Sequence, residues 1–160
     1  MIIRPLIESD YKEVAAIYKK GMDTGIATFE TRVPSWDTWD RKFLSTCRFV
    51  IEDHNKIIGW CALSKVSERD VYRGVVEDTI YLDPEYHGKR IGRKLLNHLI
   101  SESEKKGFWS LYAAIFPQNK PSIALHQNCG FRIIGTREKI AQRDGKWHDN
   151  VLMERRSSLF

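Results

Sequence analysis

The stretch from Val75 to Leu96, VVEDTIYLDPEYHGKRIGRKLL, is the most informative segment of this chain. Up to Leu82 it is rich in β-branched and aromatic residues, which is typical of a strand, and Asp83-Pro84 ends that strand. From Ile91 onward apolar residues recur at helical spacing, which predicts an amphipathic helix that stops at Gly107. The segment therefore predicts a strand, a turn, a basic glycine-containing loop and a helix, in that order.

The loop from Gly88 to Gly92 has the features of a phosphate-binding turn. Four cations lie in or directly after it, at Lys89, Arg90, Arg93 and Lys94. A helix start leaves backbone N–H groups unpaired, and the helix dipole favours an anion there. Basic residues oppose that dipole, so a bound polyanion would explain them better than an ordinary solvated connection. The loop lacks the nucleotide P-loop and dinucleotide fingerprints, which disfavours ATP and NAD.

Composition predicts one globular domain over residues 1–160. The hydrophobic content of 42% and charged content of 29% are ordinary for such a domain. The chain shows neither a membrane-spanning run nor a signal peptide, so we expect a cytoplasmic protein that does not associate with membranes. Three cysteines without pairing spacing predict reduced thiols, and the histidines show no metal-ligand spacing, so we expect no metal.

The net charge of +5 raises the question of nucleic acid. Acidic and basic residues are mixed along most of the chain, and the positive charge concentrates between Lys89 and Lys94. A local cluster without interleaved aromatic residues favours a small phosphorylated ligand over a nucleic acid. A nucleic-acid-binding module remains an alternative, which predicts steeply salt-dependent duplex binding.

The order of the expected elements is β-α-α-β-β-β-α-β-α-β-β. We expect strands at 2–6, 48–52, 56–65, 74–82, 108–116, 131–140 and 146–154, and helices beginning at 9 or 10 and covering 35–47, 91–106 and 119–128. This order predicts the α/β (α+β) class, with a mixed and mostly antiparallel sheet and helices on both faces. The strands and helices do not alternate regularly, which disfavours a doubly wound sheet.

Glu77 is a candidate functional carboxylate on the strand of this segment. On an extended strand it shares a face with Thr79 and Tyr81, and a carboxylate among Val and Ile is unexpected for simple packing. The alternative is an edge-strand carboxylate that faces water.

Three segments together resemble the GNAT superfamily of N-acetyltransferases. The stretch already quoted is similar to its acetyl-coenzyme A motif, and NKPSIALHQNCGF (119–131) to its second motif. GKWHDNVLM (145–153) resembles the C-terminal strand of phosphinothricin acetyltransferases and related amino-acid N-acetyltransferases, and Thr28-Phe29-Glu30 resembles their pocket segment. The chain departs from the pattern at His87, where Gln is usual, and at Arg90, where Gly is usual. Many members have Tyr in place of His126.

The resemblance implies a single-domain GNAT-like fold and a homodimer. It also implies transfer of acetyl from acetyl-CoA to the α-amine of a small amino acid or analogue, of the phosphinothricin, methionine sulfoximine or methionine sulfone type. A protein N-terminus or polyamine acceptor and a non-catalytic CoA-binding module are the alternatives.

The resemblance also assigns roles to residues. It places the base at Glu77 and implies that His126 takes the place of the acid that protonates the leaving thiolate. The implied cofactor-binding residues are Ile80, Tyr81, Leu82, Gly88, Lys89, Arg90, Ile91, Gly92, Arg93 and Asn119. The implied substrate-binding residues are Phe29, Glu30, Tyr72, Arg73 and His148. An Arg such as Arg73 suits a carboxylate or phosphinate because it forms two parallel hydrogen bonds.

Overall fold

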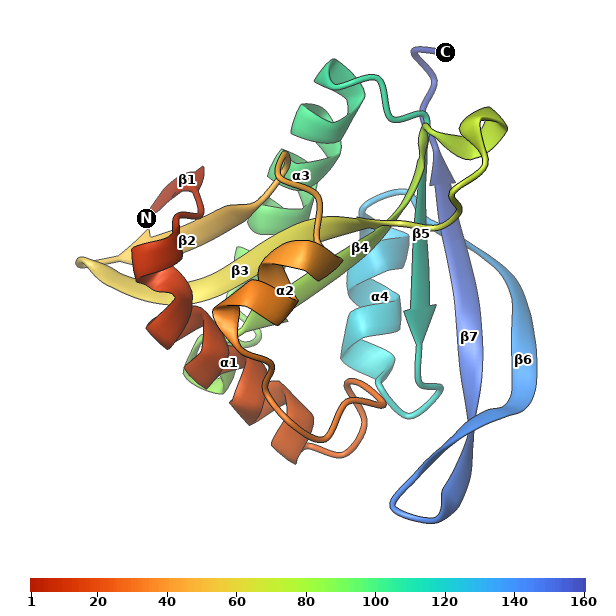
Figure 1. The fold of residues 1–160 in the computed structure, drawn as a ribbon, viewed down its shortest axis with the longest axis horizontal. Coiled ribbons are helices and arrows are strands. Elements are labelled where there is room, and N and C mark those ends of the chain that lie inside the picture. Colours follow the sequence, from red (N-terminus) through yellow and green to blue (C-terminus); the bar gives the residue numbers. More distant parts are fainter.

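The computed structural model describes residues 1–160 and contains a seven-stranded sheet with helices on both faces (Figure 1). The strands, in the spatial order β1-β2-β3-β4-β5-β7-β6, are β1 (Ile2–Pro5), β2 (Phe49–Asp53), β3 (Lys56–Lys65), β4 (Val75–Leu82), β5 (Ser110–Ile115), β7 (Lys146–Arg156) and β6 (Arg132–Arg143). The helices are α1 (Tyr11–Asp23), α2 (Trp36–Lys42), α3 (Ile91–Lys105) and α4 (Lys120–Asn128). All neighbouring strands are antiparallel except β4 and β5, which confirms the expected mixed sheet.

The largest differences from the expected bounds are in α2 and in the final hairpin. Helix α2 ends at Lys42 rather than at Cys47, because Phe43 is extended and the Leu44 amide donates to the Leu63 carbonyl at 2.8 Å. Pairing with β3 thus overrides the local helical pattern. The hairpin of β6 and β7 runs beyond 140 and 154, and its turn uses left-handed φ values at Asp144 and Gly145. No helix of the chain is long and apolar enough to cross a membrane.

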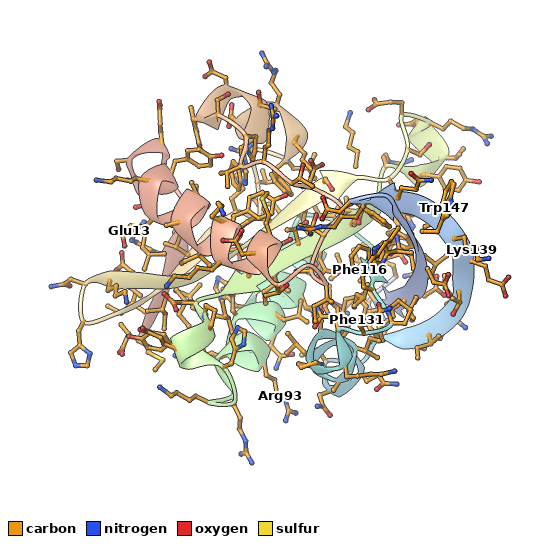
Figure 2. The ribbon with its side chains drawn as sticks, turned by 90° about the horizontal axis from the view of Figure 1, so that it is seen from below. Glu13, Arg93, Phe116, Phe131, Lys139 and Trp147 are labelled. Carbon is orange, nitrogen blue, oxygen red and sulfur yellow. The ribbon has the colours of Figure 1, made fainter.

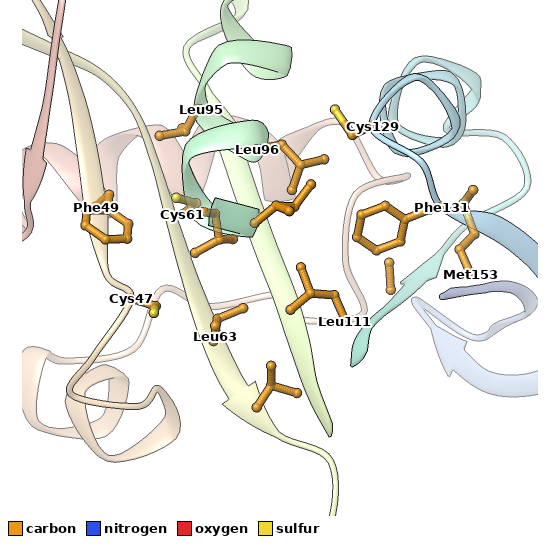
Figure 3. Packing of buried hydrophobic residues seen from close by; sticks show 14 of the residues in the cluster. Cys47, Phe49, Cys61, Leu63, Leu95, Leu96, Leu111, Cys129, Phe131 and Met153 are labelled. Carbon is orange, nitrogen blue, oxygen red and sulfur yellow. The ribbon is translucent and has the colours of Figure 1, made fainter. Parts of the chain in front are cut away.

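The core on one face lies between the sheet and helices α3 and α4 (Figure 3). Leu95, Leu96 and Leu99 of α3 are fully buried there, which confirms the expected apolar face of that helix. The same cluster contains the three free cysteines at Cys47, Cys61 and Cys129. Burial raises the pKa of each of these thiols.

An aromatic core fills the other face, beneath helices α1 and α2. Trp39 and Trp60 are fully buried, and their ring centroids lie 5.5 Å apart. Tyr81 of β4 stacks on Trp60 at 5.2 Å with an interplanar angle of 21°, and Tyr18 of α1 packs against both. These contacts fix the second half of β4 from this side.

Strands β4 and β5 separate after a short stretch of pairing. Their parallel register has three pairs, Val75–Ser110, Val76–Leu111 and Glu77–Tyr112, although both strands continue. Figure 1 shows the two strands starting side by side and then diverging, with α4 by the opening. From residue 78 onward β4 has a neighbouring strand on the β3 side alone. An unpaired strand edge of this kind can hydrogen-bond an extended ligand.

Candidate active site

Glu77 lies at the last residue pair before β4 and β5 separate. Its cross-strand neighbours are Ser64 of β3 and Tyr112 of β5. The side chain is half-buried, and that burial raises the pKa of the Glu77 carboxyl above its ordinary value of 4.5. The negative charge of Asp78 raises this pKa further, whereas the positive charges of Lys42 and Arg137 act against the rise. A carboxylate with a raised pKa is better matched to proton abstraction from an amine.

Asp78 points to the opposite face and forms a buried ion pair with His126 of α4. The Nε2 atom of His126 lies 3.0 Å from Oδ2 of Asp78, and its Nδ1 atom lies 2.7 Å from the Ser122 carbonyl oxygen. Burial alone would lower the pKa of His126, but the charge and hydrogen bond of Asp78 and the Ser122 carbonyl raise it overall. The Ser122 carbonyl and an ionised Asp78 are both acceptors, so this geometry suits the protonated ring, in which both nitrogens donate.

This arrangement argues against the acid role that the resemblance implies for His126. The residue is only 2% exposed, and both of its N–H groups are occupied by protein acceptors. A proton donor to a leaving thiolate needs an N–H group that can reach it. The geometry places His126 as a link between α4 and β4.

The basic loop before α3 has the backbone shape of an anion-binding turn. Gly88 has a φ of 74°, and Arg90 has a left-handed φ of 60°. No side chain caps the start of α3, so the first amides of that helix remain available to a ligand. Lys89, Arg90 and Arg93 are exposed, and Arg93 projects outward from α3 (Figure 2).

Ile91 and Gly92 face inward, so they offer a ligand only their main chain. Ile91 is buried in the core. A Cβ atom at Gly92 would lie 3.1 Å from Cδ1 of Leu82 and 3.3 Å from Cδ2 of Leu125. Glycine therefore lets α3 approach β4 and α4 closely. The Nε2 atom of His87 lies 3.2 Å from the Leu82 carbonyl oxygen, which ties the turn back to β4.

Four other implied cofactor-binding positions have structural partners. Ile80 and Leu82 pack against the α3 side of the sheet, whereas Tyr81 packs against the aromatic core on the other side. Asn119 caps α4, because its Oδ1 accepts a hydrogen bond from the Ser122 amide at 3.3 Å. A binding role for Asn119 would coexist with this cap.

Three of the implied substrate-binding residues gather at the far end of β5. The ring of Phe29 lies 4.6 Å from that of Phe116, and the His148 ring stacks on Phe116 at 5.0 Å. Glu30 directly follows Phe29 in sequence, and its carboxylate is 3.8 Å from the Lys42 ammonium. Figure 2 shows Phe116 inside the molecule and Trp147, which is 58% exposed, at its margin.

Tyr72 and Arg73 lie at the other end of β5, so the structure does not bring the implied substrate residues into one group. The Arg73 guanidinium lies 5.5 Å from the ring of Trp109 and 3.4 Å from the carboxylate of Asp70. Trp109 directly precedes β5 and Phe116 directly follows it, a separation of about 20 Å along an extended strand. Cavities of about 470 Å³ and 290 Å³ lie beside Arg73, and Glu77 lines neither of them.

The structure adds four residues to the site that the sequence patterns did not indicate. They are Lys42 and Arg137, whose charges act on Glu77, Tyr112, which pairs with Glu77 across the sheet, and Arg143. Arg143 donates to the Thr28 carbonyl at 2.6 Å and to the Met22 carbonyl at 2.7 Å. Of these four residues, only Tyr112 could have been predicted, because side chains alternate between the two faces along its strand.

Comparison with known proteins identifies the family. Residues 14–131 match the Acetyltransferase (GNAT) family. Phosphinothricin N-acetyltransferase of Alcaligenes faecalis is 33% identical over 160 residues, which cover 96% of this chain and 81% of that protein.

Two solved structures are similar over nearly the whole chain. A GNAT superfamily phosphinothricin acetyltransferase from Sinorhizobium meliloti, in complex with AcCoA, is 32% identical with a TM-score of 0.86, covering 97% of this chain and 87% of the other. A ribosomal-protein-alanine N-acetyltransferase from Brucella melitensis is 26% identical with a TM-score of 0.90, covering 98% and 100%.

The residues of this chain fit acetyl-CoA as a ligand. The uncapped start of α3 suits a diphosphate, and the unpaired edge of β4 suits an extended arm that carries amide groups. We conclude that this chain belongs to the GNAT family, in its phosphinothricin acetyltransferase-like branch, and is an acetyl-CoA-dependent N-acetyltransferase.

Proposed function

We propose that this enzyme acetylates the α-amine of a small amino acid or analogue, of the phosphinothricin, methionine sulfoximine or methionine sulfone type, with Glu77 as the general base. The observation that carries the proposal is the place of Glu77: a carboxyl of raised pKa at the point where β4 and β5 separate. The amine attacks directly, without a covalent enzyme intermediate, and Glu77 takes its proton either directly or through a water molecule.

An α-amine asks less of such a base than a lysine-type amine does. A peptide-type α-amine, with a pKa of about 8, is roughly a tenth neutral at pH 7, whereas an amine near 10.4 is neutral at well under about 0.1%. The neighbouring carboxylate of a free amino acid raises the pKa of its α-amine above the peptide value. The raised pKa of Glu77 reduces the difference between the pKa of the base and that of the amine, which favours proton transfer.

The donor would lie along β4 and the start of α3. When bound, acetyl-CoA supplies the activated acetyl thioester. The main chain of Ile80, Tyr81 and Leu82 would hold its arm, and the turn from Gly88 to Arg93, with the charges of Lys89 and Arg90, would hold its diphosphate. This assignment is supported by the unpaired edge of β4 and by the absence of a side-chain cap on α3. Asn119 would add a contact from α4.

For the acceptor, we favour the region between Glu77 and Phe116. Lys42 and Arg137 supply positive charge there for the carboxylate of an amino acid, and Arg137 pairs with no carboxylate of its own chain. Phe29, Glu30 and His148 would form the wall of this region. Arg73 and Tyr72, which lie beside the start of β4, are the alternative site for the carboxylate.

The apolar side chains Ile133, Ile134, Ile140 and Trp147 are exposed on β6 and β7. A homodimer of the kind that the family resemblance implies would have an apolar surface available there. Sedimentation equilibrium over a range of protein concentrations tests this part of the proposal.

A thiol-release assay with acetyl-CoA tests the acceptor class. The panel contains phosphinothricin, methionine sulfoximine, methionine sulfone, spermidine and a peptide with an N-terminal alanine. We expect turnover with the amino-acid analogues, and a loss on the order of 10²–10⁴-fold in E77Q. Near-normal turnover by E77Q would exclude Glu77 as the base. Turnover with spermidine alone would exclude small amino acids and their analogues as the acceptors.

A protein N-terminus is the second candidate acceptor, because one similar structure is named a ribosomal-protein-alanine N-acetyltransferase. A peptide has no free carboxylate beside its amine, so it does not need the charges of Lys42 and Arg137. Preference for the alanine peptide over every free amino acid would favour this candidate.

A further inference from the structure

Asp78 lies at the position where β4 loses its neighbour on the β5 side. The last β4–β5 pair is Glu77–Tyr112, and Asp78 is the next residue. A central strand is normally held by hydrogen bonds on both sides, whereas from this point onward β4 is held by strand pairing with β3 alone and by packing on its two faces. That stretch of β4 begins next to the candidate base and continues into the edge that we assign to the donor.

The ion pair with His126 provides a support at this position. The two side chains are 3% and 1% exposed, and the Nε2–Oδ2 distance is 3.0 Å. The other carboxylate oxygen of Asp78, Oδ1, is buried without a hydrogen-bond partner. His126 is therefore the group that compensates the charge of Asp78 in the core.

Contacts within α4 and with Phe131 fix the orientation of the His126 ring. The Nδ1 atom of His126 donates to the Ser122 carbonyl one helical turn earlier, and the Phe131 ring packs edge-on against the imidazole at 4.9 Å. Leu125, the preceding residue, lies close to Gly92 of α3. The helix thus joins α3 and β4 at the opening between the two strands (Figure 1).

We propose that His126 is a positioning residue: through Asp78 it holds β4 where β5 leaves it, and so fixes Glu77 and the donor-binding main chain of residues 78–82. The inference rests on the proposed roles of Glu77 and of this strand edge. It assigns to His126 a function other than protonating the leaving thiolate.

Replacing His126 by Gln or by Asn, whose side-chain amides are neutral, distinguishes the positioning role from the acid role. In H126Q the side-chain amide reaches the place of Nε2 and can donate to Asp78, whereas in H126N the shorter amide reaches the place of Nδ1 and can donate only to the Ser122 carbonyl. Neither amide can act as an acid. We expect H126Q to keep most of the acetyl-CoA affinity and of kcat, and H126N to lose both, with kcat down by about 10²-fold.

The measurements are acetyl-CoA affinity by calorimetry and kcat by thiol release, both well below the unfolding temperature of each variant. H98Q is the matched control, because His98 is half-buried on α3 against Phe49 and lies outside the site. It is expected to change thermal stability without changing affinity or kcat. D78N/H126Q, which keeps an amide pair in place of the ion pair, is a further variant expected to outperform H126N.

Equal loss of kcat in H126Q and H126N, with acetyl-CoA affinity unchanged in both, would overturn the proposal and restore the acid role. Equal loss of affinity in both would show that the bond to Asp78 is not what positions β4. Failure of the proposed function itself is recognised separately, because wild-type protein would then bind acetyl-CoA but release no thiol with any acceptor.

Discussion

At the scale of single residues, the immediate neighbours of Glu77 set its protonation. Burial and the charge of Asp78 raise its pKa above 4.5, and Lys42 and Arg137 oppose that rise. A base acts when it is ionised, so activity must fall as the pH drops through this raised pKa. We therefore expect the acidic limb of kcat/KM to lie above pH 4.5, and K42M to move it to higher pH.

The matched control for K42M is K19M, which removes an exposed lysine paired with Asp23 on α1. The acidic limb of K19M should coincide with that of the wild type. A limb at or below pH 4.5 in the wild type, or an unmoved limb in K42M, would contradict this account of Glu77.

Arg90 holds a backbone conformation that suits glycine. Its φ of 60° and ψ of 11° lie in the left-handed region, which costs an L-residue energy that glycine does not pay. We expect R90G to be more stable than the wild type by about 1 kcal/mol in urea unfolding, and R90A to show no such gain. Both variants lose the same guanidinium, so both should bind acetyl-CoA equally less tightly. A gain in R90A as large as in R90G would place the strain elsewhere.

At the scale of elements, the sequence predicted the bounds of a strand or helix well where its local pattern and its tertiary contacts favour the same structure. The strand Lys56–Lys65 has the expected bounds, because a buried apolar run and the turn before it both favour it. The helix expected over 35–47 was too long, since Phe43 and Leu44 leave it to pair with β3. Such a pairing partner is distant in sequence, so helical spacing carries no sign of it.

The candidate site likewise contains residues that a local pattern indicates and residues that only the fold brings together. Glu77 and the turn before α3 lie in one contiguous segment, where the order of strand, loop and helix indicated both. Lys42, Tyr112 and Arg137 come from three separate elements that only packing and strand register bring together. For this reason the family resemblance led us to group Arg73 with Phe29, whereas the fold places them at opposite ends of β5.

The β6–β7 hairpin is expected to fix the acceptor wall through Arg143. Its side chain is only 10% exposed, and its guanidinium donates to the carbonyls of Met22 and Thr28, which flank the segment that leads to Phe29. In R143M these carbonyls lose their hydrogen-bond donors, so the segment that carries Phe29 becomes more mobile. We expect the acceptor KM to rise about tenfold, equivalent to about 1.4 kcal/mol, with acetyl-CoA affinity unchanged.

R132M is the control for R143M, because Arg132 lies on the same strand and pairs with Glu154 at the surface. Its acceptor KM should stay at the wild-type value. Loss of acetyl-CoA affinity in R143M would mean that the hairpin supports the donor site instead.

At the scale of the whole molecule, buried charges should make stability depend on pH in opposite directions at the two ends of the range. The Arg4 guanidinium lowers the pKa of Asp10. Burial acts to raise the pKa of Asp83, but the Lys20 ammonium, the Glu85 amide and the charge of Lys56 together lower it. Stability from these carboxylates is present above their unfolded pKa of 3.8 and is lost as the pH falls through the lower folded values.

His126 acts in the opposite direction. Its folded pKa is raised above 6.5, so the stabilisation it provides is complete below pH 6.5 and is lost as the pH rises through the folded value. We expect the free energy of unfolding, measured in urea, to decline on the alkaline side in the wild type but far less in H126Q, whose amide does not titrate. H98Q should keep the wild-type decline. Persistence of the full decline in H126Q would show that another group titrates there, and would remove the buried imidazolium as its cause.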